Sequence, residues 1–221
     1  MRSTSTRFFR KKLPSTALLL DFDETIAIPD KNAKGEYIVR EDGSIGARIM
    51  DKTKLARMVN LSIFFQVPIH IVTARADIPG DKEVVYSIID SVDGFHKGVG
   101  GFKREYVHFC SIKPNGEWKQ IKEKEEVCAE IHGRQYSYLD RKSLLFVDDM
   151  VKYLEGVKKA GFSTFQANPE TKEHYAVIEK CIITQGHSLN DLNIDSSLKE
   201  MVDSAFGQQS NTAKRLGSGF R

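Results

Sequence analysis

Short apolar runs recur along most of the chain, and segments with helical periodicity separate them. Runs of this length, without alternating polar residues, are typical of strands buried on both faces of a sheet. We predict five such strands, at 16–22, 68–73, 106–112, 143–147 and 162–167. The first, TALLLDF, is the clearest, because its apolar centre is flanked by polar residues on both sides.

The segments between these strands read as helices. We predict helices at 51–64, 77–89, 117–132 and 150–160, with a glycine-rich loop at 94–101. Strands that alternate with helices form parallel sheets covered on both faces. The sequence therefore predicts an α/β fold with a doubly wound, Rossmann-like parallel sheet of about five strands.

A different pattern occupies the segment after the first strand. Asp42-Gly43 lies between two β-rich stretches, EYIVRE and SIGARIM, and Asp-Gly in this setting is a strong hairpin signal. We expect a small β-hairpin flap over residues 35–50. We further expect a core at 15–168, a helical appendage at 169–206 and a disordered tail at 207–221.

Composition narrows the class of protein. With 221 residues, 40% of them hydrophobic, the chain is long enough for one domain with a sizeable core. No apolar run approaches the ~20 residues that span a bilayer, so we expect no membrane span. Three scattered cysteines suggest a reducing, cytoplasmic compartment rather than a disulfide framework. The six histidines show no metal-binding spacing, so zinc is not expected.

The formal charge of +3 comes from the two ends of the chain. The first twelve residues carry five basic side chains and the last fifteen carry three, with no acid in either stretch, so the body between them is −5. We interpret residues 1–14 as a solvated basic arm, since no signal peptide is recognised. An anionic partner such as nucleic acid stays open.

Acidic side chains gather at the predicted strand ends. Asp21 and Asp23 leave the first strand on the same side, about 6–7 Å apart along the chain. Thr73 follows the second strand, and Asp148 and Asp149 follow the fourth. One acid could cap the next helix, but capping does not account for two. Ligands bind at the carboxyl ends of parallel strands, and a cluster of oxygen ligands suits Mg²⁺.

These motifs resemble the haloacid dehalogenase (HAD) superfamily of phosphohydrolases and phosphotransferases. LLLDFDET at 18–25 is similar to its first motif, HIVTAR at 70–75 to its second, and LLFVDDMVKYLEGVKKAGF at 144–162 to its fourth. The resemblance covers roughly residues 15–168. It implies a Mg²⁺-dependent phosphatase that works through an aspartyl-phosphate intermediate.

The resemblance also implies roles for individual residues. Asp21 would be the nucleophile, and Asp23 the general acid and then base, with its backbone carbonyl on the metal. Asp148 would bind Mg²⁺ together with Asp21, and Asp149 would complete the shell or orient its partners. Thr73 would donate a hydrogen bond to the transferring phosphoryl group.

The remaining expected site residues surround the phosphate. Glu24, Thr25 and Arg75 are candidates for substrate binding, and backbone N–H groups of residues 22–25 can cradle phosphate oxygens. For Arg75 a purely structural role is equally open. The active-site lysine implied by the resemblance is Lys124 or, as a rival, Lys119, while two others fit less well (Lys122 and Lys103).

The expected substrate follows from what the chain lacks. Only 47 residues separate Thr25 from Thr73, which leaves no room for a full cap domain there. The DFDET stretch resembles the DxDET signature of capless protein phosphatases. We therefore expect an open site and a macromolecular substrate such as a phosphoprotein. The alternatives are a small-metabolite or polynucleotide-end phosphatase, and a non-catalytic module that binds phosphate.

Overall fold

The computed structural model describes residues 13–93 and 99–186. Its centre is a six-stranded sheet in the order β6-β5-β4-β1-β7-β8. The strands are β1 (Ala17–Leu20), β4 (Ile69–Ala76), β5 (Val107–Ile112), β6 (Lys119–Gln120), β7 (Leu144–Asp148) and β8 (Ser163–Gln166). All neighbours pair in parallel except β5 and β6. The predicted doubly wound parallel sheet is confirmed.

The central strands are buried as the apolar runs predicted. Every residue of β1 and β7 is buried, and β1 lies between β4 and β7. Leu18 is in register with Ile69 on one side and Leu145 on the other. This register brings the carboxyl ends of β1, β4 and β7 to the same edge of the sheet.

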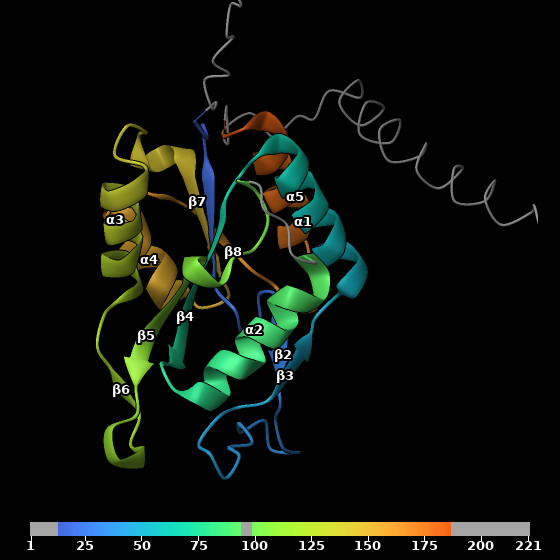
Figure 1. The fold of residues 1–221 in the computed structure, drawn as a ribbon, viewed down its shortest axis with the longest axis vertical. Helices are drawn as coiled ribbons and strands as arrows, with labels where there is room; N and C mark the ends of the chain where they lie inside the picture. The colour runs from blue at the N-terminus through green and yellow to red at the C-terminus, as the bar shows by residue number, and fades with distance from the viewer. Residues whose placement is uncertain (1–12, 94–98, 187–221) are drawn as a thin grey trace, which may run out of the picture. The chain divides into compact units, whose positions relative to one another are not determined.

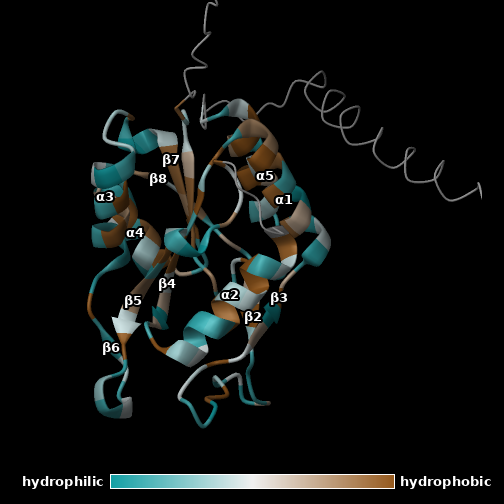
Figure 2. Ribbon diagram, viewed as in Figure 1, coloured by the Kyte–Doolittle hydropathy of each residue, from teal (hydrophilic) through white to brown (hydrophobic). Residues whose placement is uncertain are grey.

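Among the described residues, five α-helices cover the two faces of the sheet, as can be followed in Figure 1. They are α1 (Lys52–Phe65), α2 (Pro79–Asp93), α3 (Lys124–Gln135), α4 (Val151–Lys159) and α5 (His174–Thr184). Helices α3 and α4 pack together on one face, while α1 packs with α2 and α5 on the other. In Figure 2 the hydrophobic sides of the helices turn toward the sheet. One core cluster joins Leu19 and Phe146 of the sheet to Cys128 and Val157 of the helices.

Helix α3 begins later than the sequence pattern predicted. We expected a helix over 117–132, but Lys119 and Gln120 form the short edge strand β6, paired antiparallel with β5. The helix starts at Lys124, where Glu123 and Glu126 form a capping box. The prediction was wrong because pairing with an edge strand is a long-range contact that local periodicity does not reveal.

The flap also differs from the hairpin that we expected at 35–50. Its base is formed by β2 (Ala27–Pro29) and β3 (Ala47–Ile49), which pair antiparallel. Between them only single bridges connect the two arms, at Lys31–Tyr37 and Val39–Ile45. The turn at Asp42-Gly43 is present, and Gly43 has a φ of 80°. We call residues 27–49 the flap; it extends from the bottom of the sheet in Figure 1.

The remaining predictions concern the ends of the chain. Helix α5 packs against α1, and the three cysteines are free and buried. None of the helices among the described residues is long and apolar enough to cross a bilayer. The basic arm up to residue 12, most of the glycine-rich loop, and the predicted helix and tail after residue 186 lie outside the described residues.

Candidate active site

The carboxyl ends of β1, β4 and β7 open into a cavity of about 460 Å³. Asp21 follows β1 directly, Asp148 is the last residue of β7, and Arg75 belongs to β4. The walls come from the flap, from the turn between β5 and β6, and from the start of α4. The charged residues that the sequence placed on separate strands therefore meet at one edge of the sheet.

Lys124 joins two of these strand ends. Its ammonium group donates to Asp21 Oδ1 at 2.6 Å and to Asp148 Oδ2 at 2.7 Å. It lies over the ring of Tyr153, with its Nζ 4.5 Å from the ring centroid. The Lys124 side chain is 1% exposed. It comes from the first turn of α3 and reaches the carboxyl ends of β1 and β7.

The other candidate lysines have different surroundings. Lys119 is exposed on β6, and the Lys122 ammonium donates to Glu130 at 2.6 Å. Lys103 lies over the ring of Tyr106, with its Nζ 5.2 Å from the ring centroid. The structure thus places Lys124, and none of these three, between the site carboxylates.

Burial and the neighbouring carboxylates raise the pKa values of Asp21 and Asp149. Burial raises the pKa of Asp21 to about 8, the neighbouring Asp148 and Asp23 add to this, and only Lys124 opposes it. Burial likewise raises the pKa of Asp149 to about 6, with Asp148 as the next cause. For Lys124, burial lowers the pKa, but the two bonded carboxylates outweigh it and raise the pKa overall. The site holds more negative charge than its lysine balances.

Three of the carboxylates could hold a metal ion. Asp21, Asp148 and Asp149 each offer an oxygen, and these oxygens lie within 4.8 Å of one another. Within residues 13–93 and 99–186, Lys124 is the only cation bonded to them, so three ionised carboxylates leave two negative charges, which a divalent cation balances. The donor set is all oxygen, which suits Mg²⁺. The backbone N–H of Met150 donates to Asp148 Oδ1 at 2.8 Å and fixes that carboxylate.

Arg75 is bound to Asp23 through two parallel hydrogen bonds. Its Nε donates to Oδ2 at 2.9 Å and its Nη2 to Oδ1 at 2.8 Å. Its Nη1 donates to Asp81 Oδ1 at 3.2 Å and to the carbonyl of Ile45 in the flap. The guanidinium is 2% exposed and lies over the ring of Phe22. Four guanidinium N–H groups thus donate to protein oxygen atoms, so the geometry of Arg75 supports a positioning role rather than contact with substrate phosphate.

The two threonines are buried. We had predicted that the second strand ends at Thr73. Strand β4 instead continues to Ala76, so Thr73 lies within the strand. The Thr73 hydroxyl oxygen accepts from the backbone N–H of Arg75 at 3.2 Å. Thr25 is fully buried, and its carbonyl accepts from His174 of α5 at 2.9 Å. This contact connects α5 to the turn after β1.

Glu24 occupies a strained position next to these residues. It has a φ of 56°, in the left-handed region, and its carboxylate accepts from Lys31 of the flap at 2.6 Å. Its backbone N–H donates to the carbonyl of Ala27 at 2.8 Å, so this amide is already used within the turn. Of the N–H groups of residues 22–25, those of the other three residues are the candidates for binding phosphate.

Several residues at the site escaped the sequence analysis. Asp81 accepts from the backbone N–H groups of Ile45 and Ala76, and His174 comes from a helix remote in sequence. Tyr37 also lines the cavity, from the flap. The only signal for Asp81 is an acid in the first turn of a helix, which is too common to single out a residue.

No protein-family model and no curated protein matches the sequence. Solved structures with a similar fold include a protein assigned as a HAD-like phosphatase from Mesorhizobium loti, 14% identical over 81% of this chain and 91% of its own, with a TM-score of 0.48. Another is the 3-deoxy-D-manno-octulosonate 8-phosphate phosphatase of Moraxella catarrhalis, solved with magnesium, phosphate and KDO. It is 13% identical over 76% of this chain and 87% of its own, with a TM-score of 0.44.

A third is a protein assigned to the YrbI family of phosphatases from Pseudomonas syringae. It is 12% identical over 80% of this chain and 89% of its own, with a TM-score of 0.42. At these identities and TM-scores the chemistry of the site has to be judged from its own residues.

Proposed function

We propose that this chain is a Mg²⁺-dependent phosphatase that hydrolyses phosphomonoesters through a phosphorylated aspartate. One observation carries the proposal: Lys124 bridges Asp21 and Asp148, while Asp149 lies close enough to share a cation with both. A cluster that only stabilised the fold would not need this excess of buried negative charge.

Asp21 is the proposed nucleophile because it ends β1 at the floor of the cavity. Its carboxylate oxygen attacks phosphorus, and the bond between phosphorus and the leaving oxygen breaks. Lys124 holds the attacking carboxylate in place through a charge-assisted hydrogen bond. Water then attacks the phosphorus of the aspartyl-phosphate, which releases inorganic phosphate and restores Asp21.

Asp23 is the proposed general acid and base. It gives a proton to the leaving oxygen in the first step and takes one from the attacking water in the second. The two hydrogen bonds from Arg75 fix the plane of the Asp23 carboxyl group. We assign Arg75 to positioning, because four of its five N–H groups already donate to Asp23, Asp81 and the flap.

Asp21, Asp148, Asp149 and the backbone carbonyl of Asp23 are the proposed ligands of Mg²⁺. Bound there, the ion would offset the negative charge that develops on the phosphoryl group. It would also favour the ionised form of Asp21, whose pKa burial raises. Thr73 remains the proposed hydroxyl donor to the phosphoryl group, and Glu24 and Thr25 remain proposed members of the substrate-binding turn.

The identity of the substrate is a separate question. The phosphoprotein that we expected from the sequence stays a prediction, as do the small-metabolite and polynucleotide-end alternatives. A binding module without turnover is the less favoured reading. A protein that only bound phosphate would gain from cations at the cavity, whereas this site is rich in carboxylates.

The test is release of phosphate from nitrophenyl phosphate with Mg²⁺ present. We expect hydrolysis by the wild type, and none above background after chelation or in Asp21→Asn. Asp140→Asn is the matched control, because Asp140 is an exposed aspartate that caps a short turn before β7. Hydrolysis that survives both the chelator and Asp21→Asn would contradict the proposal.

A further inference from the structure

The mouth of the active-site cavity is lined by exposed apolar side chains. Tyr37 and Val39 of the flap are 50% and 57% exposed, and both line the cavity. Trp118, before β6, is 52% exposed, and Met150, before α4, is 44% exposed. Large apolar side chains that gather at one opening mark a binding site more often than chance exposure does.

Trp118 is held so that its ring faces this opening. Its Nε1–H donates to the carbonyl of Ala74 at 3.3 Å, which satisfies its one polar group at the end of β4. The rest of the indole is apolar surface beside the catalytic strand ends. An aromatic ring with its donor already satisfied offers packing to a ligand rather than a hydrogen bond.

Hydrogen bonds hold the flap, which carries Tyr37 and Val39, against the neighbouring elements. Arg75 donates to the Ile45 carbonyl, and Asp81 accepts from the Ile45 N–H at 3.1 Å. Lys113 donates to the carbonyl of Gly43 at the turn. Three contacts thus tie the flap to β4, α2 and the segment after β5, so the apolar wall belongs to the same built site as the carboxylates.

The charges at the cavity select against an anionic leaving group. Its lining cations are Arg75, Lys113 and Lys124, and each already donates to protein oxygen atoms. The lining acids outnumber them: Asp21, Asp23, Glu24, Asp81 and Asp149. Bound Mg²⁺ would offset two of these acids, but a second negative group on the substrate would meet no lining cation that is not already hydrogen-bonded to the protein.

From these observations we propose that the cavity takes a phosphomonoester whose leaving group carries an uncharged aromatic ring. The ring would pack against Trp118, Tyr37 and Val39 while the phosphate reaches Asp21. This inference rests on the proposed phosphatase function and adds the substrate class to it. It makes polynucleotide ends and phosphorylated sugar acids poor substrates, because both carry further negative charge.

The single tryptophan of the chain allows a direct binding test. Because Trp118 is the only tryptophan, its fluorescence reports on the cavity mouth alone. We expect benzylphosphonate, which cannot be hydrolysed, to change this fluorescence saturably in the presence of Mg²⁺ and to bind at least about tenfold more tightly than methylphosphonate. Equal affinity for the two phosphonates, or no saturable change with benzylphosphonate, would overturn the inference.

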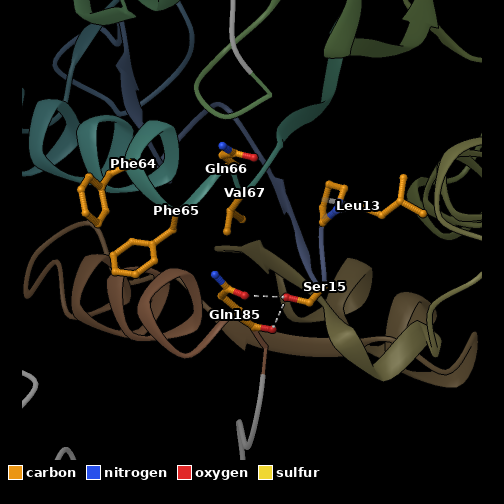
Figure 3. Close-up of a pocket in the computed structure, with 8 residues that line it drawn as sticks. Leu13, Ser15, Phe64, Phe65, Gln66, Val67 and Gln185 are labelled. Carbon is orange, nitrogen blue, oxygen red and sulfur yellow. Dashed lines mark hydrogen bonds between the residues drawn. The ribbon is translucent and has the colours of Figure 1, made fainter. Parts of the chain in front are cut away.

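Variants separate the aromatic wall from general effects. Tyr37→Ala should weaken benzylphosphonate binding severalfold and leave methylphosphonate unchanged. Phe64→Ala is the matched control, since Phe64 is an exposed aromatic residue that lines a different cavity, of about 220 Å³, at the amino-terminal end of the sheet (Figure 3). If Tyr37→Ala instead changes the sedimentation coefficient of the protein and leaves benzylphosphonate binding intact, the flap docks a second chain and the inference fails.

Turnover provides the second readout. Benzyl phosphate, para-carboxybenzyl phosphate and glycerol phosphate are all esters of primary alcohols, so their leaving groups are chemically similar. We expect kcat/KM to be highest for benzyl phosphate, and Trp118→Ala to raise KM for that ester alone. Similar kcat/KM for the three esters would overturn the aromatic preference. Benzylphosphonate binding without hydrolysis of any ester would instead contradict the phosphatase function and leave the aromatic site standing.

Discussion

Two buried polar clusters lie at the same sheet but differ in charge. At the carboxyl ends of β1 and β7, Asp21, Asp148 and Lys124 form a charged cluster with an excess of acid. Within the sheet, His70 of β4 is fully buried and shares hydrogen bonds with His108, at 3.1 Å, and with Tyr136, at 2.8 Å. Neutral side chains make the hydrogen bonds of the histidine cluster, whereas the carboxylate cluster needs a further cation to balance its charge.

This difference separates stability from chemistry. Burial lowers the pKa of His70 to about 3, so its ring stays neutral at ordinary pH. A neutral, paired network adds to stability and costs little in desolvation. Unbalanced buried carboxylates cost stability, and they persist where a reaction or a metal requires them. The comparison predicts opposite responses to mutation at the two clusters.

The largest effect is expected from Asp21→Asn. Loss of the nucleophile should lower kcat by at least about 10⁴-fold. Without metal and above about pH 8, where Asp21 is ionised, the same change should raise the melting temperature, because it removes one of the mutually repelling carboxylates and keeps an oxygen for Lys124. Activity assays and thermal melts in chelator test both halves. A lower melting temperature would show that the Asp21 carboxylate stabilises the fold, which contradicts the comparison.

Lys124→Met should harm both function and stability. It leaves Asp21 and Asp148 buried without their ammonium partner, which costs about 3–5 kcal/mol of unfolding free energy. Activity should fall about 10²–10³-fold, as for other groups that stabilise charge at an active site. Lys119→Met is the matched control: Lys119 is exposed on β6, so its loss should change stability by less than about 0.5 kcal/mol.

Arg75→Lys tests whether Arg75 acts by positioning Asp23, the proposed general acid. Lysine keeps the charge but cannot make the two parallel hydrogen bonds to Asp23. We expect kcat to fall about 10–100-fold for benzyl phosphate, which needs a proton on its leaving oxygen, with little change in KM. The loss should be smaller for nitrophenyl phosphate, whose leaving group needs no proton. An equal loss for the two esters would assign Arg75 to the fold rather than to Asp23.

Arg104→Lys serves as the control for that substitution. Arg104 pairs with Asp90 on the exposed surface of α2, away from the cavity. Its replacement should leave kcat unchanged for both esters.

The smallest effect on activity is expected at the neutral cluster. His70→Phe removes the hydrogen-bond partner of Tyr136 and should cost about 1–3 kcal/mol of stability with kcat/KM unchanged. Because the pKa of His70 is lowered on folding, its contribution is complete above the unfolded value of 6.5 and is lost as the pH falls from 6.5 toward 3. The stability gap between the wild type and the variant, from denaturant titrations, should narrow over that range. A constant gap would show that His70 takes up its proton equally in both states.

The sequence predicted the parts of this molecule that depend on local pattern. The apolar run of β1 and the helix predicted from residue 51, where the Asp51 carboxylate accepts from the Lys54 N–H at 3.1 Å, are examples. The acids at the ends of β1 and β7 could be expected to converge because parallel strands align their carboxyl ends. The predicted roles rest on a resemblance of whole motifs, in their order, strand context and spacing.

Contacts between distant segments could not be predicted in the same way. Strand β6 forms only because Gln120 pairs with Ser111, and the base of the flap depends on pairing across about twenty residues. The contacts of Asp81 with the flap and of His174 with Thr25 join elements whose separation in sequence carries no pattern. The part of Tyr37 in the cavity lining could not be predicted for the same reason, because Tyr37 and Trp118 come to one cavity only through the fold.

The most direct test of the central claim is to trap the phosphorylated protein. Wild-type protein turning over nitrophenyl phosphate with Mg²⁺ should be quenched in acid, digested and analysed by mass spectrometry. We predict a phosphate on the peptide that contains Asp21, located at Asp21 by fragmentation, and no phosphopeptide from Asp21→Asn. Turnover with no phosphorylated peptide, or with phosphate located on a different residue, would contradict the account.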